Sequence, residues 1–211
     1  MIFIGKLLVF ALLVFSLHAY AQNCYDLNFQ HKSDIPSTCF NMVMTMLHDQ
    51  NDRPYLYIAN KEGGLKIYDI SRLSAPVEVK TIPISLLNNL HVMNLTQSGN
   101  YLYLALGNHF TSSQSPGMAI IDVADPVNAG VTGKWKFSKT DGGGGIVKVL
   151  GNYAYLGAMK HGLVILDISN KSDIKLVSQF VPDINYPDKK PDAKKINARD
   201  AGYCRYCLPL L

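Results

Sequence analysis

The feature that most constrains the fold of this chain is a unit that occurs three times. Residues 55–70 read YLYIANKEGGLKIYDI, two short runs rich in Tyr, Leu and Ile that are separated by polar residues and glycine. Residues 101–123 and 153–168 contain counterparts of both runs. Branched and aromatic side chains pack well on a pleated surface, so each unit predicts a β-hairpin. The glycines at positions 63, 64 and 162 are expected to take positive φ in tight turns.

Each hairpin is flanked by one further apolar run on either side. The leading runs are residues 40–48, 91–96 and 145–150, and the closing runs are residues 77–83, 131–137 and 174–181. Four short strands in about 40–50 residues are typical of one propeller blade. The predicted fold is therefore all-β, a propeller of four-stranded blades with about three blades and the start of a fourth. Tyr-x-Tyr spacing puts both rings of a copy on one sheet face, and the apolar second run of each hairpin predicts a strand covered on both faces.

Residues 1–21 have the pattern of a secretory signal peptide. Lys6 precedes an apolar run over residues 7–17, and Ala19-Tyr20-Ala21 is an A-x-A cleavage site. A membrane-spanning helix needs about 20 apolar residues, so this run predicts no stable membrane span after cleavage. We expect an exported protein, located in the periplasm, at the cell surface or outside the cell. An uncleaved N-terminal anchor is the alternative.

The net charge of +4 is too small to indicate a nucleic-acid partner. Four cysteines in an exported chain permit disulfides. A bridge between Cys24 and Cys39 would tie the N-terminal arm, residues 22–39, to the first blade, although the spacing alone does not settle the pairing. Cys204 and Cys207 form a C-x-x-C without the His of a haem site or further zinc ligands nearby, which favours an incidental or locally bridged pair.

Few residues in the chain are candidates for a functional site. The aspartates that end each hairpin, Asp69, Asp122 and Asp167, stand where a strand meets a turn. There they are expected to accept bonds from backbone N–H groups, a structural role, and not to bind metal or act as acids. The long loop over residues 107–117 carries His109 and Phe110, which are weak candidates for binding; the alternative is a tolerated surface insertion. No catalytic residue, metal site or cofactor is predicted.

Three segments carry a resemblance to a known family. GLKIYDIS at residues 64–71, GMAIIDVADP at 117–126 and GLVILDIS at 162–169 resemble the LVIVD repeat of bacterial and archaeal cell-surface proteins. The resemblance covers roughly residues 40–182. It implies four strands per repeat and a propeller-like assembly outside the cytoplasm. It supplies no catalytic residues.

The predicted organisation leaves the propeller open. Residues 40–184 form three blades, and residues 185–211 read as a partial fourth repeat with an irregular tail. Closed propellers use about four to eight blades, so three blades expose two apolar end faces. The sequence therefore predicts the front part of a longer, truncated propeller. The alternative is a chain that self-associates through its open blade faces.

The predicted function is that of an exported, non-enzymatic binding or scaffold module whose partner is an unknown protein or glycan. The alternative is a lactonase-like propeller hydrolase with a metal in the central channel. Such a site would need carboxylates on the innermost strands. The leading runs and their flanks, residues 36–48, 84–98 and 142–152, contain no Asp or Glu, which favours binding over catalysis.

Overall fold

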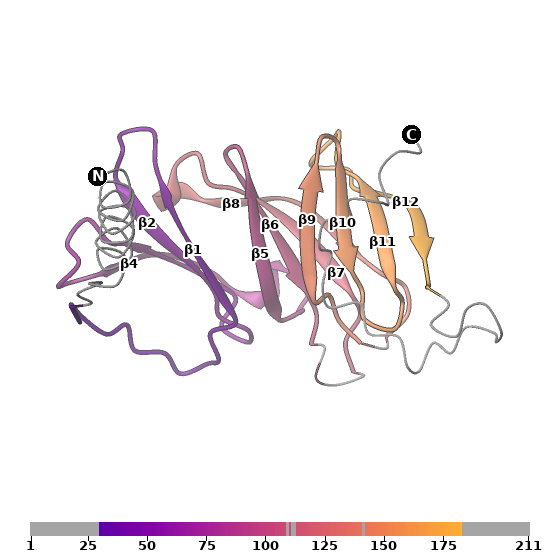
Figure 1. Ribbon diagram of the computed structural model, residues 1–211, viewed down its shortest axis with the longest axis horizontal. Coiled ribbons are helices and arrows are strands. Elements are labelled where there is room, and N and C mark those ends of the chain that lie inside the picture. The colour runs from indigo at the N-terminus through magenta and orange to yellow at the C-terminus, as the bar shows by residue number, and fades with distance from the viewer. Residues whose placement is uncertain (1–29, 109, 111–112, 141, 183–211) are drawn as a thin grey trace, which may run out of the picture. The chain divides into compact units, whose positions relative to one another are not determined.

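The computed structural model describes residues 30–108, 110, 113–140 and 142–182, which form three four-stranded antiparallel sheets (Figure 1). The prediction of an all-β fold built from four-stranded blades is confirmed. The predicted signal peptide and the predicted partial fourth repeat lie outside the described residues, as do Cys24, His109, Cys204 and Cys207. Within the described part, no helix is both long and apolar enough to cross a membrane.

The strands of each blade follow the order of the chain. Blade 1 contains β1 (Val43–His48), β2 (Pro54–Ala59), β3 (Leu65–Asp69) and β4 (Val77–Ile82). Blade 2 contains β5 (Val92–Ser98), β6 (Tyr101–Leu106), β7 (Gly117–Asp122) and β8 (Gly130–Lys136). Blade 3 contains β9 (Ile146–Leu150), β10 (Tyr153–Gly157), β11 (Leu163–Asp167) and β12 (Lys175–Phe180). Two 3₁₀ turns, η1 (Ile84–Leu86) and η2 (Pro126–Asn128), complete the described elements.

The three blades share one register. The first tyrosine of each hairpin lies opposite the aspartate that ends it: Tyr55 with Asp69, Tyr101 with Asp122, and Tyr153 with Asp167. The third and fourth strands of every blade shift register at the same step, after Ile67, Ile120 and Ile165. Such a shift marks a β-bulge, which bends the strand and increases its twist. The repeat therefore copies a backbone irregularity together with the side-chain pattern.

Each sheet has two different faces, because side chains alternate along a strand. We call the side with the Tyr-x-Tyr pair the tyrosine face and the opposite side the aliphatic face. Buried residues of the tyrosine face of blade 1 share a core cluster with those of the aliphatic face of blade 2, among them Tyr55, Tyr57, Ile67, Leu102, Leu104 and Ile121. Blades 2 and 3 share a second cluster in the same orientation, among them Tyr103, Met118, Ile120, Leu156, Val164 and Leu166. The blades thus pack in series, tyrosine face against aliphatic face.

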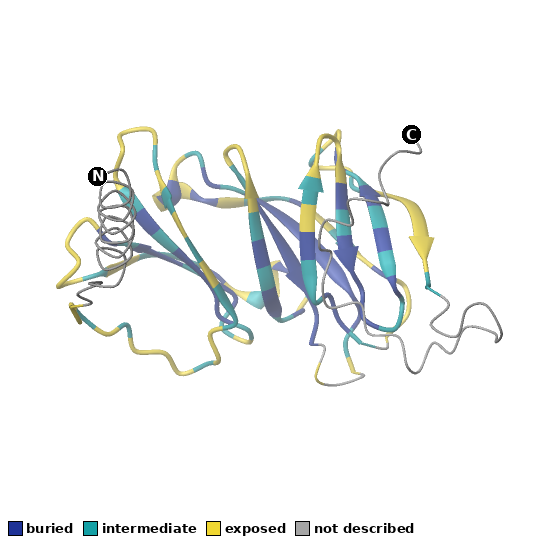
Figure 2. Ribbon diagram, viewed as in Figure 1, coloured by how far each residue is buried: buried dark blue, intermediate teal, exposed yellow. Residues whose placement is uncertain are grey.

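Burial is greatest in the central blade. Along β7 every residue except the last is buried, whereas β11 alternates between buried and half-buried positions (Figure 2). The prediction that each such strand is covered on both faces is therefore correct for β7 and wrong for β11. The physical reason is that the described residues place a blade on both sides of blade 2 and on only one side of blade 3.

The turn between the second and third strands is tight in blades 1 and 3. In blade 1 the N–H of Asn60 donates to the carbonyl of Gly64 at 2.8 Å. Gly64 has a φ of +87°, and a Cβ there would lie 2.1 Å from the Ile82 carbonyl oxygen, so only glycine fits. The second residue with positive φ is Lys61 and not Gly63, which corrects the sequence prediction. Blade 3 repeats the arrangement with Met159 and Gly162.

Candidate functional site

The turns between second and third strands lie beside the start of the following blade. The N–H of Val92, at the start of β5, donates to the carbonyl of Lys61 at 3.1 Å, and the N–H of Gly144 donates to the carbonyl of Leu106 at 2.8 Å. The first bond joins the turn of blade 1 to the first strand of blade 2, and the second joins the end of β6 to the segment before β9. Polar and aromatic side chains from separate parts of the chain meet at the first of these junctions.

Lys61 is at the centre of this group. Its ammonium nitrogen lies 2.8 Å from Glu62 Oε1, 5.1 Å from the centre of the Phe40 ring and 5.8 Å from the centre of the Phe110 ring. Both rings are within the range of a cation–π contact. His91 Nδ1 lies 3.7 Å from the same oxygen of Glu62. We call the group of Phe40, Lys61, Glu62, His91, Phe110 and Gln114 the Lys61 cluster.

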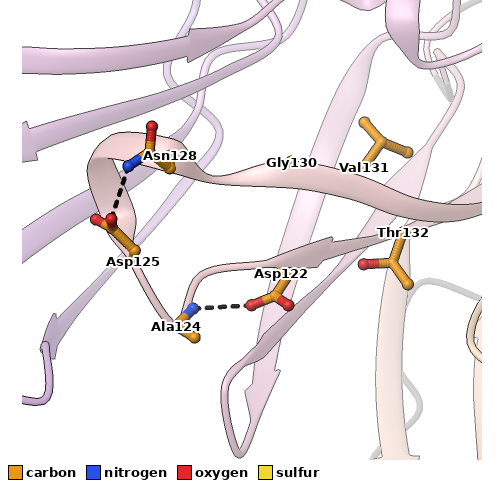
Figure 3. Close-up of a pocket in the computed structure, with 7 residues that line it drawn as sticks. All are labelled: Asp122, Ala124, Asp125, Asn128, Gly130, Val131 and Thr132. Atoms are coloured by element: carbon orange, nitrogen blue, oxygen red, sulfur yellow. Dashed lines mark hydrogen bonds between the residues drawn. The ribbon is translucent and has the colours of Figure 1, made fainter.

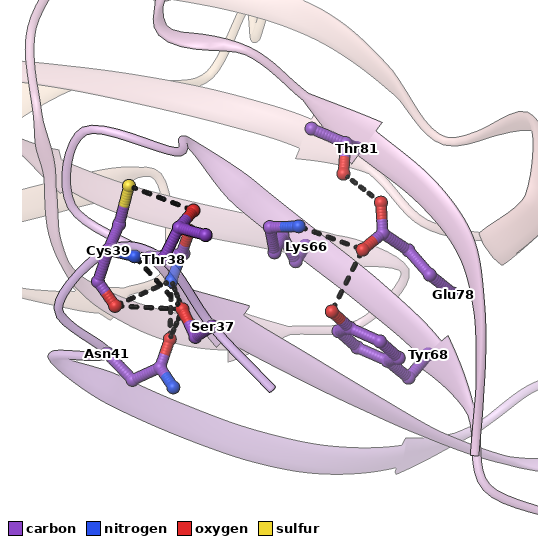
Figure 4. A network of polar contacts seen from close by, with 9 residues as sticks. Ser37, Thr38, Cys39, Asn41, Lys66, Tyr68, Glu78 and Thr81 are labelled. Carbon is purple, nitrogen blue, oxygen red and sulfur yellow. Dashed lines mark hydrogen bonds and ion pairs between the residues drawn. The ribbon is translucent and has the colours of Figure 1, made fainter. Parts of the chain in front are cut away.

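Phe40 reaches the cluster because the arm that carries it is bonded to blade 1. The buried Asn60 donates through Nδ2 to Ser37 Oγ at 2.8 Å and also to Asn41 Oδ1. Ser37 Oγ in turn donates to the Cys39 carbonyl at 2.8 Å (Figure 4). The N–H of Met42 donates to the Ala59 carbonyl at 2.8 Å. One buried amide therefore fixes the arm on both sides of Phe40.

Phe110 is positioned by two polar side chains of its own loop. Gln114 Oε1 accepts hydrogen bonds from the N–H of His91 at 3.2 Å and from the N–H of Asn108 at 2.9 Å. Asn108 Oδ1 accepts from the N–H of Phe110 at 2.9 Å, a local turn typical of asparagine. The loop between β6 and β7 is therefore attached to the start of β5 at the point where Phe110 projects.

The charges of the cluster balance. Partial burial alone would raise the pKa of Glu62, but the hydrogen bond from Lys61 and the charges of Lys61 and His91 outweigh it, so the pKa is lower than usual. Burial lowers the pKa of His91, aided by the charge of Lys61 and opposed by Glu62. At neutral pH the cluster thus holds a lysine–glutamate ion pair beside an uncharged imidazole.

The arrangement offers several groups that could contact a ligand. The rings of Phe40 and Phe110 are 73% and 62% exposed, while the side chain of Lys61 is mostly covered. Exposed rings on a fixed backbone offer apolar faces at low entropic cost, and Glu62 remains available to accept hydrogen bonds. Among the residues that the structure describes, no group of three or more His, Cys, Asp or Glu could hold a metal ion.

The three repeat aspartates are each bonded to the turn that follows them. Asp69 Oδ1 accepts from the N–H of Ser71 at 2.8 Å, and Asp167 Oδ1 accepts from the N–H of Ser169 at 2.8 Å. The side-chain and backbone hydrogen bonds from Ser71 hold the pKa of Asp69 below its usual value, and the backbone and side-chain hydrogen bonds from Ser169 do the same for the pKa of Asp167. Asp122 accepts from the N–H of Ala124 at 2.9 Å. Their structural role stays a prediction.

Asp122 also lines an open hollow of about 370 Å³ in blade 2 (Figure 3). The hollow is also lined by a second acidic residue, Asp125. The carboxylate of Asp125 accepts hydrogen bonds from the N–H of Val127 at 3.2 Å and from Asn128 Nδ2 at 2.7 Å. The hydrogen bond from Asn128 is the main cause of the lowered pKa of Asp125. Both carboxylates are therefore engaged in their own turns, and the hollow is a weaker candidate for a site than the Lys61 cluster.

The structure places the remaining predicted site residues as follows. Phe110 belongs to the Lys61 cluster, whereas His109 lies outside the described residues. Cys39 is a free cysteine within the described part of the chain, but Cys24 lies outside it, so a bridge between the two stays a prediction. Sequence reasoning missed Phe40, Lys61, Glu62 and His91. One signal in the sequence could have found part of the cluster. Residues 60–64 and 107–117 both connect the second and third strands of a blade, and such equivalent turns are expected at the same end of successive blades.

Three sheets of equal topology, stacked through one recurring interface, define a repeat protein of the propeller-blade class. The model of the LVIVD repeat matches residues 54–82, 91–135 and 142–181, more than half of the chain. The chain belongs to the LVIVD repeat family.

Among solved structures, the chain is similar to the crystal structure of 1,3Gal43A, an exo-β-1,3-galactanase from Clostridium thermocellum, with 12% sequence identity and a TM-score of 0.41. The similarity covers 66% of this chain and 34% of the galactanase, so the chain spans about a third of that protein's length. The search of curated proteins found no match.

Proposed function

We propose that the chain is an exported, non-enzymatic LVIVD module that binds a protein or glycan through the Lys61 cluster. The observation that carries this proposal is the pair of exposed rings, Phe40 and Phe110, that both lie within about 6 Å of the Lys61 ammonium, which is itself paired with Glu62. Aromatic side chains are enriched in binding surfaces and supply much of their affinity.

The local scaffold supports a binding role because little ordering is left for a ligand to impose. Asn60 fixes the arm that carries Phe40, and Gln114 fixes the loop that carries Phe110. A surface that is ordered in advance loses less conformational entropy on association. Export is supported by the signal-peptide pattern of residues 1–21 and by the cell-surface location that the family resemblance implies.

The binding proposal is tested by screening the purified protein against a glycan array and against solubilised cell-envelope proteins. Each hit is then measured again with the double variant Phe40→Ala/Phe110→Ala. We expect affinity to fall about tenfold or more, the effect of losing roughly 1.4 kcal/mol of binding free energy. Val127→Ala, which shortens an exposed side chain of η2 away from the cluster, is the matched control and should bind as the parent does.

Two results would contradict the proposal. One is turnover in an ester and lactone screen together with a stoichiometric, tightly bound metal, which would favour the lactonase-like alternative. The other is a set of ligands whose binding is unchanged in the double variant. Export is tested separately by fractionating the cells and sequencing the N-terminus, which we expect to begin at Gln22.

A further inference from the structure

The tyrosine face of blade 3 is open where the equivalent faces of blades 1 and 2 are covered. Ile82, Trp135 and Phe180 occupy one register position, opposite Leu65, Met118 and Leu163. Ile82 is 1% exposed and Trp135 packs against a core cluster, but Phe180 is 60% exposed. Tyr153 is 39% exposed, whereas its counterpart Tyr55 is buried. Blade 3 therefore presents an apolar surface that the other blades bury.

The aliphatic face of blade 1 is open along its first strand. Met44, Leu95 and Val147 are equivalent, since they lie opposite Ile58, Leu104 and Leu156. Leu95 and Val147 are buried, at 6% and 0% exposure, whereas Met44 is 57% exposed. Met46, on the same face, is exposed as well. Methionine adapts its shape to a partner surface, so this strand is suited to packing.

The two interfaces within the chain show which strands meet. β5 contacts both β1 and β2 of the preceding blade, and β9 contacts both β5 and β6. The first strand of each blade therefore packs on the first two strands of the blade before it. Continued by one step, this rule places β1 against β9 and β10 of another copy. Met44 lies on β1 and Tyr153 lies on β10.

The remainder of the aliphatic face of blade 1 is already covered within the chain. Ile35 packs against Ile58, Tyr68 and Ile70. Lys66 and Tyr68 replace the aliphatic residues of the other blades, and both bond to Glu78 on β4, at 2.8 Å each (Figure 4). This polar network lies on β3 and β4, away from the first strand. It therefore leaves β1 free to pack.

We propose that two copies of the chain associate head to tail, with the tyrosine face of blade 3 of each copy against β1 of the other. Two such interfaces close a ring of six blades. Closed propellers contain about four to eight blades, and the three described blades of two copies together give a number in that range. The contact is heterologous, and its closure ends the association at the dimer.

The proposal is tested by light scattering of the purified protein after gel filtration, with the N-terminus verified by mass spectrometry. We expect a dimer. Met44→Glu and Tyr153→Glu each place a charge in the proposed interface and should each give a folded monomer, because both side chains are exposed in the single chain. Circular dichroism checks the fold. Val127→Glu, an equally drastic change at an exposed site of blade 2, should remain dimeric.

Mixing the two interface variants distinguishes this arrangement from others. Met44→Glu retains an intact tyrosine face and Tyr153→Glu retains an intact β1, so the mixture should form a mixed dimer through one interface. A parent protein that is monomeric, or that forms larger polymers, overturns the proposal. So does a dimer that tolerates Met44→Glu, since that result indicates a symmetric contact between two copies of blade 3.

Discussion

Glu78 shows how a single carboxylate stabilises the outer strands of blade 1. It accepts hydrogen bonds from Lys66 Nζ and Tyr68 Oη, each at 2.8 Å, and from Thr81 Oγ1 at 2.6 Å. The hydrogen bonds from Lys66, Thr81 and Tyr68 lower the pKa of Glu78 to about 2, against the opposing effect of burial. The charged form is therefore favoured in the folded state.

We predict that Glu78 makes the stability of blade 1 depend on acid pH. Because its pKa is lower in the folded chain than in the unfolded chain, its contribution is complete above about pH 4.5 and is lost as the pH falls toward about 2. The carboxylate is partly exposed, so solvent screening limits the effect to about 1 kcal/mol or less. Urea unfolding at pH 6 and pH 3 should show a smaller pH effect in Glu78→Gln than in the parent. An equal pH effect in both proteins would contradict this.

The structural role of the repeat aspartates is tested at Asp122. Asp122→Ala removes the acceptor for the N–H of Ala124, and we expect a loss of about 1 kcal/mol in the free energy of unfolding. Asp122→Asn keeps an acceptor oxygen and should lose less. Thermal unfolding of the two variants measures the difference. If both variants unfold at the same temperature as the parent, the hydrogen bond does not stabilise the fold.

The loop between β6 and β7 is held in place by one side chain, that of Gln114. Gln114→Ala removes the acceptor shared by His91 and Asn108. We predict faster hydrogen exchange at these two amides, by about tenfold, and little change in global stability, because local opening requires only a small part of the total free energy. Residue-resolved exchange by NMR makes the measurement. Exchange that accelerates equally in β10 would show that the side chain acts on the whole fold.

Strand positions could be predicted closely from the sequence. The expected units at residues 101–123 and 153–168 begin at the first residues of β6 (Tyr101–Leu106) and β10 (Tyr153–Gly157). The pattern succeeds because the same alternation of Tyr, Leu and Ile was available in three copies, so irregularities in one copy were corrected by the others. The exact turn was harder: positive φ falls on Lys61, a residue type that does not favour it, and Gly64 lies against the carbonyl of Ile82, which is distant in the sequence.

The Lys61 cluster was mostly beyond sequence reasoning. Phe40, Lys61, His91 and Phe110 belong to four different segments, and only the packing of blade 1 against blade 2 brings them together. Phe110 was a candidate because its loop departs from the repeat. The buried Asn60, which positions Phe40, gave no sign of its role in the sequence, since asparagine is also common in ordinary turns.

At the scale of the whole molecule, the blades are expected to stabilise one another. Leu156 is fully buried in the cluster that joins blades 2 and 3, whereas Leu176, on the same blade, is half exposed. We predict that Leu156→Ala lowers the free energy of unfolding by about 2–5 kcal/mol, through lost burial and the cavity left behind. Leu176→Ala is the matched control and should cost much less. Similar losses in urea unfolding of the two variants would contradict the packing described here.

The central claim is that four-stranded sheets are stable in this chain because each buries its faces against its neighbours. Native-state hydrogen exchange of the parent protein, resolved by residue, tests it most directly. We predict the slowest exchange in β6 and β7, which are covered on both faces, and faster exchange in β11 and β12. Exchange in β6 and β7 as fast as in β12 would show that the sheets do not protect one another and would contradict the account.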